Sequence, residues 1–255
     1  MRSTAVLLTL ILWAFLLASG CAGEQEEDNT TQEPSTTTEQ TELAASQPVT
    51  AKEYDQESEP EQEPSTTNLS GNGPTGTEPF ELESGLSVFH MTYQGERNFI
   101  VWLLDRNGVR VTDGLLANQM GSFKGSKAVQ TKGGPHVLDV QASGPWTITI
   151  EQPRPTNAPR TASYTYETTK TATEFFELTR GVRRFEMSHR GDRNFIVWLL
   201  DKNGAKVPGG LVANEQGPFE GSRAIQVPKD DIYLLQVEAN GPWVVQVEEI
   251  MLGAQ

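Results

Sequence analysis

The nine residues RNFIVWLLD occur at positions 97–105 and again, unchanged, at positions 193–201. Successive side chains of a β-strand point to opposite faces of a sheet. Here both sets are apolar: Phe99, Val101 and Leu103 on one face, and Ile100, Trp102 and Leu104 on the other. A strand that is apolar on both faces is covered on both sides. A sandwich core covers one side only, so we expect a loop, a second module or a partner on the other.

The repeated strand lies within a longer duplication, in which residues 80–151 correspond to residues 176–248. Five further motif pairs match in order: FEL with FEL, NG with NG, GLLAN with GLVAN, FKGSKAVQ with FEGSRAIQ, and GPWTITIE with GPWVVQVE. A tandem duplication of one structural unit explains all of these matches together. The repetition of RNFIVWLLD is therefore weak evidence for a ligand-binding motif.

Each copy has the pattern of short strands separated by turns. Apolar residues alternate with other residues in WTITI (146–150), WVVQV (243–247), YLLQVEA (233–239) and FHMTY (89–93), which predicts half-buried strands. Asn-Gly follows the central strand in both copies and is typical of a hairpin turn. We therefore expect an all-β protein with two tandem small antiparallel β-sandwich modules that are jelly-roll-like.

The N-terminus has the features of a secretion signal. Arg2 precedes an apolar stretch at 5–18 that is shorter than the about 20 residues of a membrane span. Ser19, Gly20 and Cys21 follow, and Cys21 is the only cysteine. This arrangement resembles the lipobox of bacterial lipoproteins, with Ala18 where Leu is preferred. The resemblance implies a lipid (palmitate) on Cys21 and a position on the extracytoplasmic face of a bacterial membrane, at the cell surface or in the periplasm. An ordinary signal peptide with an incidental cysteine is the alternative.

The segment after Cys21 differs sharply in composition from the rest of the chain. Residues 22–78 are rich in Glu, Gln, Thr, Ser and Pro and hold 14 Asp or Glu but one Lys, so they carry most of the net charge of −14. Such a segment buries too little apolar surface to fold, and we expect a disordered acidic tether. The remaining chain is nearly neutral, which disfavours nucleic-acid binding.

These features divide the chain into five segments. We expect a lipoprotein signal peptide at 1–20, the tether at 21–78, a first β-sandwich module at 79–152, a linker at 153–174 and a second module at 175–250. Each module is small for an independent core. The two modules are therefore expected to support each other.

Three motifs of the modules resemble those of a known domain type. They are NFxVxLxDxNG from residue 98, GxFxGS from residue 121, and the closing hairpin YLLQVEANGPWVV at 233–245. The pattern is similar to the pre-peptidase C-terminal type of accessory domain in secreted bacterial proteins. The resemblance implies a non-catalytic, jelly-roll-like accessory module at the cell surface.

No residue set suited to catalysis or metal binding is visible in the sequence. None of the three histidines, His90, His136 and His189, is matched by a histidine in the other copy. Clustered metal ligands and a G-x-S-x-G nucleophile motif are also missing from the sequence. Asp105 and Asp201 open segments that resemble the start of a calcium loop, but the bidentate Glu at the twelfth position is missing, which favours a plain turn. We expect no catalytic residue, metal or cofactor, and hence no enzyme.

The candidate ligand or interface residues are those around the doubly apolar strand: Trp102, Trp198, Arg97, Arg193, Asn98 and Asn194. Arg and Asn near a Trp suit a sugar or a carboxylate, although hydrogen bonding at the strand entry with Arg stacked on an aromatic ring explains them equally well. The leading hypothesis is recognition of, or adhesion to, an envelope polysaccharide or protein. The alternatives are a structural cell-surface spacer without a specific ligand and an enzyme whose site the sequence does not reveal. Burial of the two indoles at a module contact would favour the spacer.

Overall fold

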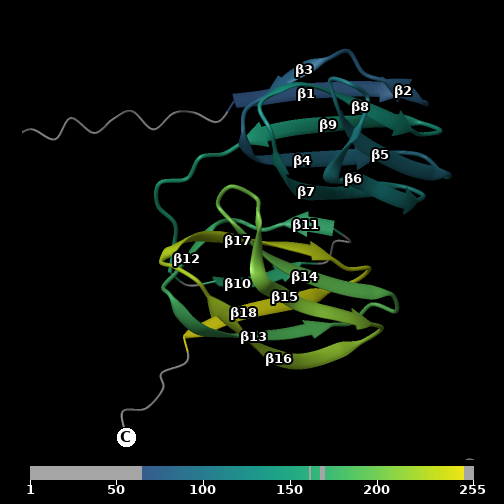
Figure 1. The fold of residues 1–255 in the computed structure, drawn as a ribbon. Coiled ribbons are helices and arrows are strands. Elements are labelled where there is room, and N and C mark those ends of the chain that lie inside the picture. Colours follow the sequence, from purple (N-terminus) through teal and green to yellow (C-terminus); the bar gives the residue numbers. More distant parts are fainter. Residues whose placement is uncertain (1–64, 161, 167–169, 250–255) are drawn as a thin grey trace, which may run out of the picture. The chain divides into compact units, whose positions relative to one another are not determined.

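The computed structural model describes residues 65–160, 162–166 and 170–249. The predicted signal peptide, Cys21 and residues 22–64 of the predicted tether lie outside the described residues. Every regular element in the described part is a β-strand (Figure 1). Among these residues there is no helix long and apolar enough to cross a membrane.

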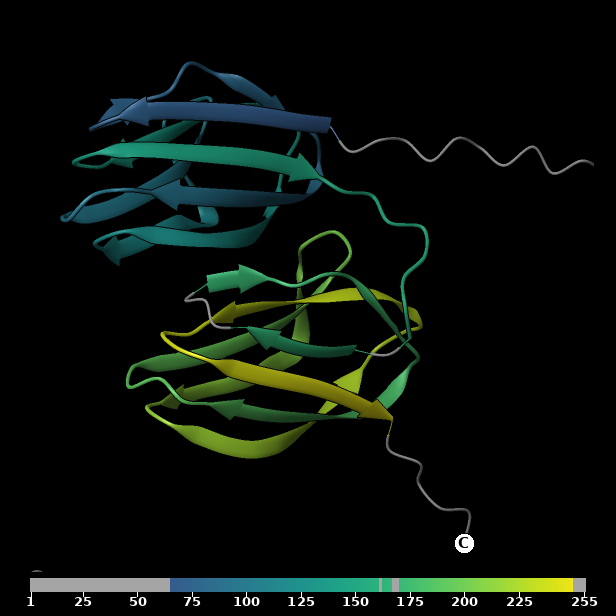
Figure 2. The same cartoon turned by 180° about the vertical axis from the view of Figure 1, so that it is seen from behind.

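The first module consists of two antiparallel sheets that pack face to face (Figures 1 and 2). The first sheet has the order β1-β9-β4-β7, with β1 at Ser65–Asn72, β9 at Pro145–Gln152, β4 at Gly85–Tyr93 and β7 at Phe123–Thr131. The second sheet has the order β2-β8-β5-β6, with β2 at Thr75–Gly76, β8 at Gly134–Gln141, β5 at Asn98–Asp105 and β6 at Arg110–Met120. The short strand β3, Phe80–Leu82, also pairs with β8.

The second module repeats this arrangement strand by strand. Its first sheet has the order β10-β18-β13-β16, with β10 at Ala162–Tyr166, β18 at Trp243–Glu249, β13 at Gly181–His189 and β16 at Phe219–Val227. Its second sheet has the order β11-β17-β14-β15, with β11 at Lys170–Ala172, β17 at Asp231–Glu238, β14 at Asn194–Asp201 and β15 at Lys206–Gln216. The short strand β12, Phe176–Leu178, pairs with β17.

The strand order identifies each module as a jelly roll. When the short β2 and β3 are counted as one strand, the eight strands of the first module change sheet at every step except between β5 and β6, and those of the second module do so except between β14 and β15. This is the double Greek-key arrangement of jelly-roll sandwiches. The predicted fold class, two tandem antiparallel β-sandwich modules, is confirmed.

The alternating patterns of the sequence fill the two cores as predicted. In the first module the inward side chains of the central strand, Phe99, Val101 and Leu103, are completely buried. They pack against inward residues of the facing sheet, such as Phe89 and Ile148. The second module has an equivalent core of its own. The core therefore accounts for one face of RNFIVWLLD in each copy.

The Asn-Gly segments form tight turns, as predicted. Asp105 Oδ1 accepts hydrogen bonds from the backbone N–H of Asn107 at 2.8 Å and of Val109 at 2.9 Å, and Gly108 has φ 74°. Asp201 makes the same two bonds in the second copy. These two backbone donors occupy the carboxylate, so the plain turn accounts for the aspartate at this position.

The predicted boundary between tether and first module is wrong. Strand β1 lies within residues 21–78, which were assigned to the tether, yet it pairs with β9 along its whole length. Leu69 packs against the core, and a Cβ on Gly71 would lie 2.5 Å from Trp146 Cζ2. An edge strand needs backbone partners and few apolar side chains, so its Ser, Thr and Asn residues resemble the composition of the tether.

The predicted linker is also too long. Strands β10 and β11 fall within residues 153–174 and pair with β18 and β17 of the second module. Tyr164 and Tyr166 of β10 pack against the core of that module. The module therefore begins by Ala162 rather than at residue 175.

Candidate binding face on the first module

The two modules contact each other through unlike outer faces. From the first module, Leu86 and Val88 of β4 and Ala128 of β7 form what we term the Ala128 face. From the second, the outward side chains of β14 and β17, Trp198, Leu200, Leu234 and Gln236, form the Trp198 face. These residues, apart from Gln236, gather in one hydrophobic cluster that is separate from the two cores.

A buried amide links the two faces through the backbone. Gln236 is 2% exposed, and its Oε1 accepts a hydrogen bond from the N–H of Ala128 at 2.7 Å. Its Nε2 lies 3.3 Å from the carbonyl oxygens of Ser126 and Thr171. Ser126 Oγ in turn accepts the N–H of Ala172 at 2.9 Å. Polar groups buried in this way specify one alignment, because each would lose its partner if the faces shifted.

Ion pairs and one close turn complete the module contact. Lys127 Nζ lies 3.1 Å from Glu238 Oε1, and Lys206 Nζ lies 2.8 Å from Asp113 Oδ1. The turn at Gly204 approaches the first module so closely that a Cβ would lie 2.9 Å from Leu86 Cδ1. Glycine is needed here both for its φ of 82° and for this approach.

The first module has the same outer face but without this cover. We term the outward side chains of β5 and β8, Ile100, Trp102, Leu104, Val137 and Asp139, the Trp102 face. All five are partly exposed. At the positions of Leu104, Val137 and Asp139, the second module has Leu200, Leu234 and Gln236, which are 3%, 1% and 2% exposed.

The turn beside the Trp102 face is also uncovered, unlike the equivalent turn of the second module. A Cβ on Gly108 would meet nothing within 4 Å, whereas its counterpart Gly204 lies against Leu86. The expectation that the repeated strand is covered on both sides therefore holds at Leu200 of the second module, while Ile196 and Trp198 stay partly exposed. It is wrong in the first, because the face that covers β14 belongs to the preceding module, and among the described residues no module precedes the first.

A cation that the sequence analysis missed lies over each of the two indoles. The guanidinium carbon of Arg110 is 4.0 Å from the ring centre of Trp102, and Lys206 Nζ is 4.8 Å from that of Trp198. Arg97 was the expected partner, but Arg110 reaches the ring because it lies opposite Leu104 in the β5–β6 hairpin. Hairpin register, rather than distance along the chain, would have identified it.

The predicted Arg-Asn pairs lie at the entry of the central strand, away from the centre of the face. Arg97 and Asn98 are exposed and line a hollow of about 660 Å³ together with Met120 and Gln141. Their counterparts Arg193 and Asn194 line a different hollow, of about 600 Å³, that also includes residues of the first module. The duplication therefore gives these pairs different surroundings.

The Trp102 face combines an apolar centre with polar groups suited to hydrogen bonding. Arg110 provides a donor and Asp139 and Gln141 provide acceptors. Beside them, hydrogen bonds from the N–H groups of Val109 and Asn107 hold the pKa of Asp105 below its usual value, so its carboxylate is ionised at neutral pH. Within the described part of the chain, no group of three or more His, Cys, Asp or Glu could hold a metal ion. The face thus combines an apolar centre with hydrogen-bonding groups at its edge.

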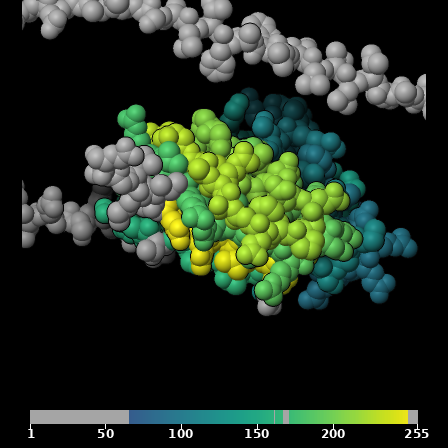
Figure 3. Space-filling view, turned by 90° about the horizontal axis from the view of Figure 1, so that it is seen from below, coloured from purple at the N-terminus to yellow at the C-terminus, as the bar shows by residue number. Residues whose placement is uncertain are grey.

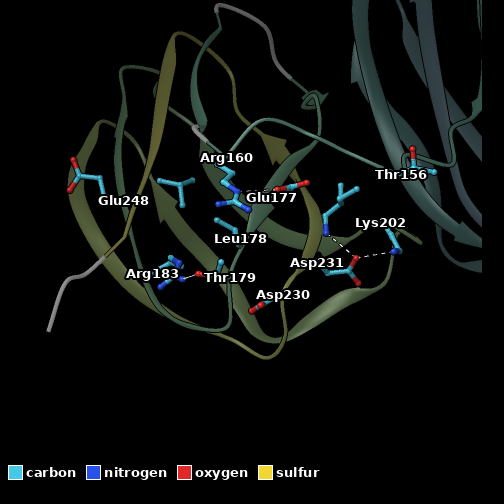
Figure 4. A pocket seen from close by; sticks show the side chains of 12 residues that line it. Thr156, Arg160, Glu177, Leu178, Thr179, Arg183, Lys202, Asp230, Asp231 and Glu248 are labelled. Carbon is cyan, nitrogen blue, oxygen red and sulfur yellow. Dashed lines mark hydrogen bonds and ion pairs between the residues drawn. The ribbon is translucent and has the colours of Figure 1, made fainter. Parts of the chain in front are cut away.

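A third hollow, of about 390 Å³, is lined mainly by residues of the second module (Figure 4). Several of its charged groups are already paired: Asp231 contacts Lys229 at 2.5 Å and Lys202 at 2.9 Å, and Arg160 contacts Glu177 at 3.3 Å. Burial alone would raise the pKa of Asp231, but the two lysines and the N–H of Ile232 outweigh it and lower the pKa to about 2. Because these pairs satisfy one another, the hollow is a weaker candidate for a binding site than the Trp102 face.

Comparisons with known proteins add little to this description. No protein-family model matches the chain, and no curated protein matches it. Among solved structures, the PBSX exported protein XepA is 11% identical, with 71% of this chain and 85% of that chain covered and a TM-score of 0.25. The tandem CBM22-1–CBM22-2 domain of Xyn10C from Paenibacillus barcinonensis is also 11% identical, with 73% and 91% covered and a TM-score of 0.24. Similarity at this level carries no argument about function, which must come from the faces themselves.

Proposed function

We propose that this protein is a non-catalytic binding protein, anchored by a lipid on Cys21 to the extracytoplasmic face of a bacterial membrane. It recognises an envelope polysaccharide or protein through the Trp102 face of its first module. The acidic segment before the modules acts as a tether that keeps this face away from the lipid surface. The anchor rests on the lipobox-like residues and the tether on composition.

One observation carries the binding proposal. Leu200 and Leu234 are buried against the first module, while Leu104 and Val137 at the equivalent positions are partly exposed. A face with an apolar centre and a polar rim is the usual composition of a recognition surface. Large aromatic residues and arginine dominate the energetics of such surfaces, and Trp102 with Arg110 provides both.

The duplication supplies a matched pair of variants to test the proposal. We expect residues 22–255, which contain every strand of both modules, to be retained on insoluble bacterial cell wall or envelope membranes. Trp102→Ala should reduce this retention at least tenfold, because it removes the centre of the binding face. Trp198→Ala makes the same change in the covered face and should leave retention largely intact. Equal retention of wild type and Trp102→Ala would contradict the proposal.

The anchor has a separate test. We expect cells that express the full chain to incorporate labelled palmitate into it, and Cys21→Ser to abolish that label. Since Cys21 is the only cysteine of the chain, no other thiol can accept a lipid. Unchanged labelling of Cys21→Ser would refute the lipid anchor while leaving the binding face untouched.

A structural spacer is the second candidate, and the second module favours it. Trp198 packs against the contact between the modules, which is a structural role. A spacer would need no binding face on the first module. Loss of retention in Trp102→Ala but not in Trp198→Ala separates the two candidates.

A further inference from the structure

We propose that the Trp102 face binds a second copy of this chain, through the face of its second module that corresponds to the Ala128 face. This inference rests on the proposed function, since it names the partner of the same binding face. The contact between the modules within one chain is its template. There, a Trp-containing face of β14 and β17 is covered by β4 and β7 of the preceding module.

The second module carries the required counterpart of the Ala128 face. Val182 and Arg184 of β13 and Ser222 and Ala224 of β16 occupy the positions of Leu86, Val88, Ser126 and Ala128; we term them the Ala224 face. Ser126 and Ala128 are buried in the module contact, whereas Ser222 and Ala224 are exposed. Figure 3 is a view from the side on which β13 and β16 lie, and side chains of the second module form its foreground. Each chain therefore presents one open face of each kind.

The residues that differ between the covered and the open faces are complementary in charge. In the covered contact, Gln236 bonds to Ala128, and Val88 is the cross-strand neighbour of Ala128. In the open faces, Asp139 replaces Gln236 and Arg184 replaces Val88, again as the neighbour of an alanine, Ala224. Docking by the same geometry would place the Asp139 carboxylate beside the Arg184 guanidinium. A neutral pair in the contact within the chain thus becomes an ion pair between chains.

Several other positions of the template keep compatible chemistry, whereas the Lys206–Asp113 pair would be lost because Gly209 stands at the position of Asp113. In the contact within the chain, Ser126 Oγ accepts an N–H from β11. Ser222 stands at the position of Ser126 in the Ala224 face, and β2 stands at the position of β11 beside the Trp102 face. Lys127 forms an ion pair with Glu238 in the contact within the chain. The corresponding residues of the open faces are Arg223 and Gln141, which can form a hydrogen bond in place of the ion pair. Arg184 also contacts Glu186 at 2.7 Å. The counterpart of Glu186 is His90, whose side chain stays 46% exposed beside the module contact, so Glu186 would lie at the rim.

The symmetry of this contact determines the assembly. The two faces are unlike and lie on different modules, so each chain can bind one neighbour by its first module and another by its second. Head-to-tail contacts that do not close into a ring extend into open rows. The sequence of modules within one chain would then continue from chain to chain, which fits adhesion between tethered copies.

A charge exchange tests the inference. Sedimentation velocity of residues 22–255 over a concentration series should show the average mass of the wild type rising with concentration. Asp139→Arg and Arg184→Asp should each raise the dissociation constant at least tenfold, because like charges then face each other. The double variant Asp139→Arg/Arg184→Asp should restore association. Glu96→Arg and Arg190→Asp, which make the same charge changes in exposed loops of the two modules, are the controls.

The outcomes separate this inference from the proposed function. Association that both single variants lose and the double variant regains supports the inference. A chain that remains monomeric at all concentrations overturns it, as does association that ignores the charge exchange. If such a chain is still retained on cell wall through Trp102, the proposed function stands and the partner is an envelope component. If retention is also absent, both proposals fail.

Discussion

Leu234→Ala is expected to lower the free energy of unfolding by about 2–5 kcal/mol, the usual cost of truncating a fully buried leucine. Leu234 is 1% exposed and belongs to the cluster between the modules, not to the core of either module. The loss should therefore appear as uncoupling: in urea, one module should unfold at a lower denaturant concentration than in the wild type. Calorimetry should show the single transition of coupled modules separating into two.

The duplication provides the control for this variant. Val137 occupies the equivalent place in the first module and is partly exposed, so Val137→Ala should cost about 1 kcal/mol or less and leave the coupling intact. If the two substitutions have equal effects, the modules do not pack through the Trp198 face. The asymmetry between the two copies would then be refuted.

Gln236→Glu is expected to destabilise the module contact at neutral pH and to recover in acid. The side chain keeps its shape and can still accept the N–H of Ala128, but a carboxylate would face the carbonyl oxygens of Ser126 and Thr171 in a buried site. Burying an unpaired charge costs several kcal/mol, so we expect a loss of about 2–4 kcal/mol at pH 7.

The pH dependence follows from the direction of the pKa shift. Burial raises the pKa of the introduced glutamate carboxyl in the folded state above its unfolded value. The contact is therefore fully stable below the unfolded pKa of about 4.3 and loses stability as the pH rises through the folded pKa. Unfolding measured between about pH 4 and pH 8 tests this, with Gln141→Glu on the exposed part of β8 as the control. A stability difference from wild type that does not change with pH would contradict the account.

The protein itself has a carboxylate in one module at the position where the other module has the buried amide. The first module has Asp139 where the second module has the buried Gln236. A carboxylate at this place is compatible with exposure or with a facing cation, but not with the uncharged cover that Gln236 meets. The two copies have therefore diverged at a position that is buried in one module and partly exposed in the other.

The fold was predictable because its cores follow local patterns. Alternation in FHMTY, WTITI and YLLQVEA placed the inward side chains correctly, and Asn-Gly marked the turns that Asp105 and Asp201 cap. Strand β1 was missed because an edge strand is held mainly by backbone hydrogen bonds, which leave little trace in composition. Ser65–Asn72 consequently resembles the tether that precedes it.

The candidate face was predictable only in part. The two apolar faces of RNFIVWLLD indicated that something beyond the core must cover Trp102 and Trp198. Identical residues could not reveal that the cover differs between the copies, because the order of the modules in space determines it. Arg110 and Lys206, which lie over the indoles, were also out of reach, since their position depends on the register of a hairpin.

Hydroxyl-radical footprinting of dilute residues 22–255 tests the central claim most directly. Cleavage after Arg97 and Arg193 releases NFIVWLLDR (98–106) and NFIVWLLDK (194–202), which share eight residues in the same order and differ in mass. Their intrinsic reactivities are therefore matched, and any difference in labelling reports their surroundings. We predict faster oxidation of the 98–106 peptide, with the excess on Leu104, which is partly exposed, and protection of its buried counterpart Leu200. Equal labelling of the two peptides would contradict the account, because the second face would then be no better covered than the first.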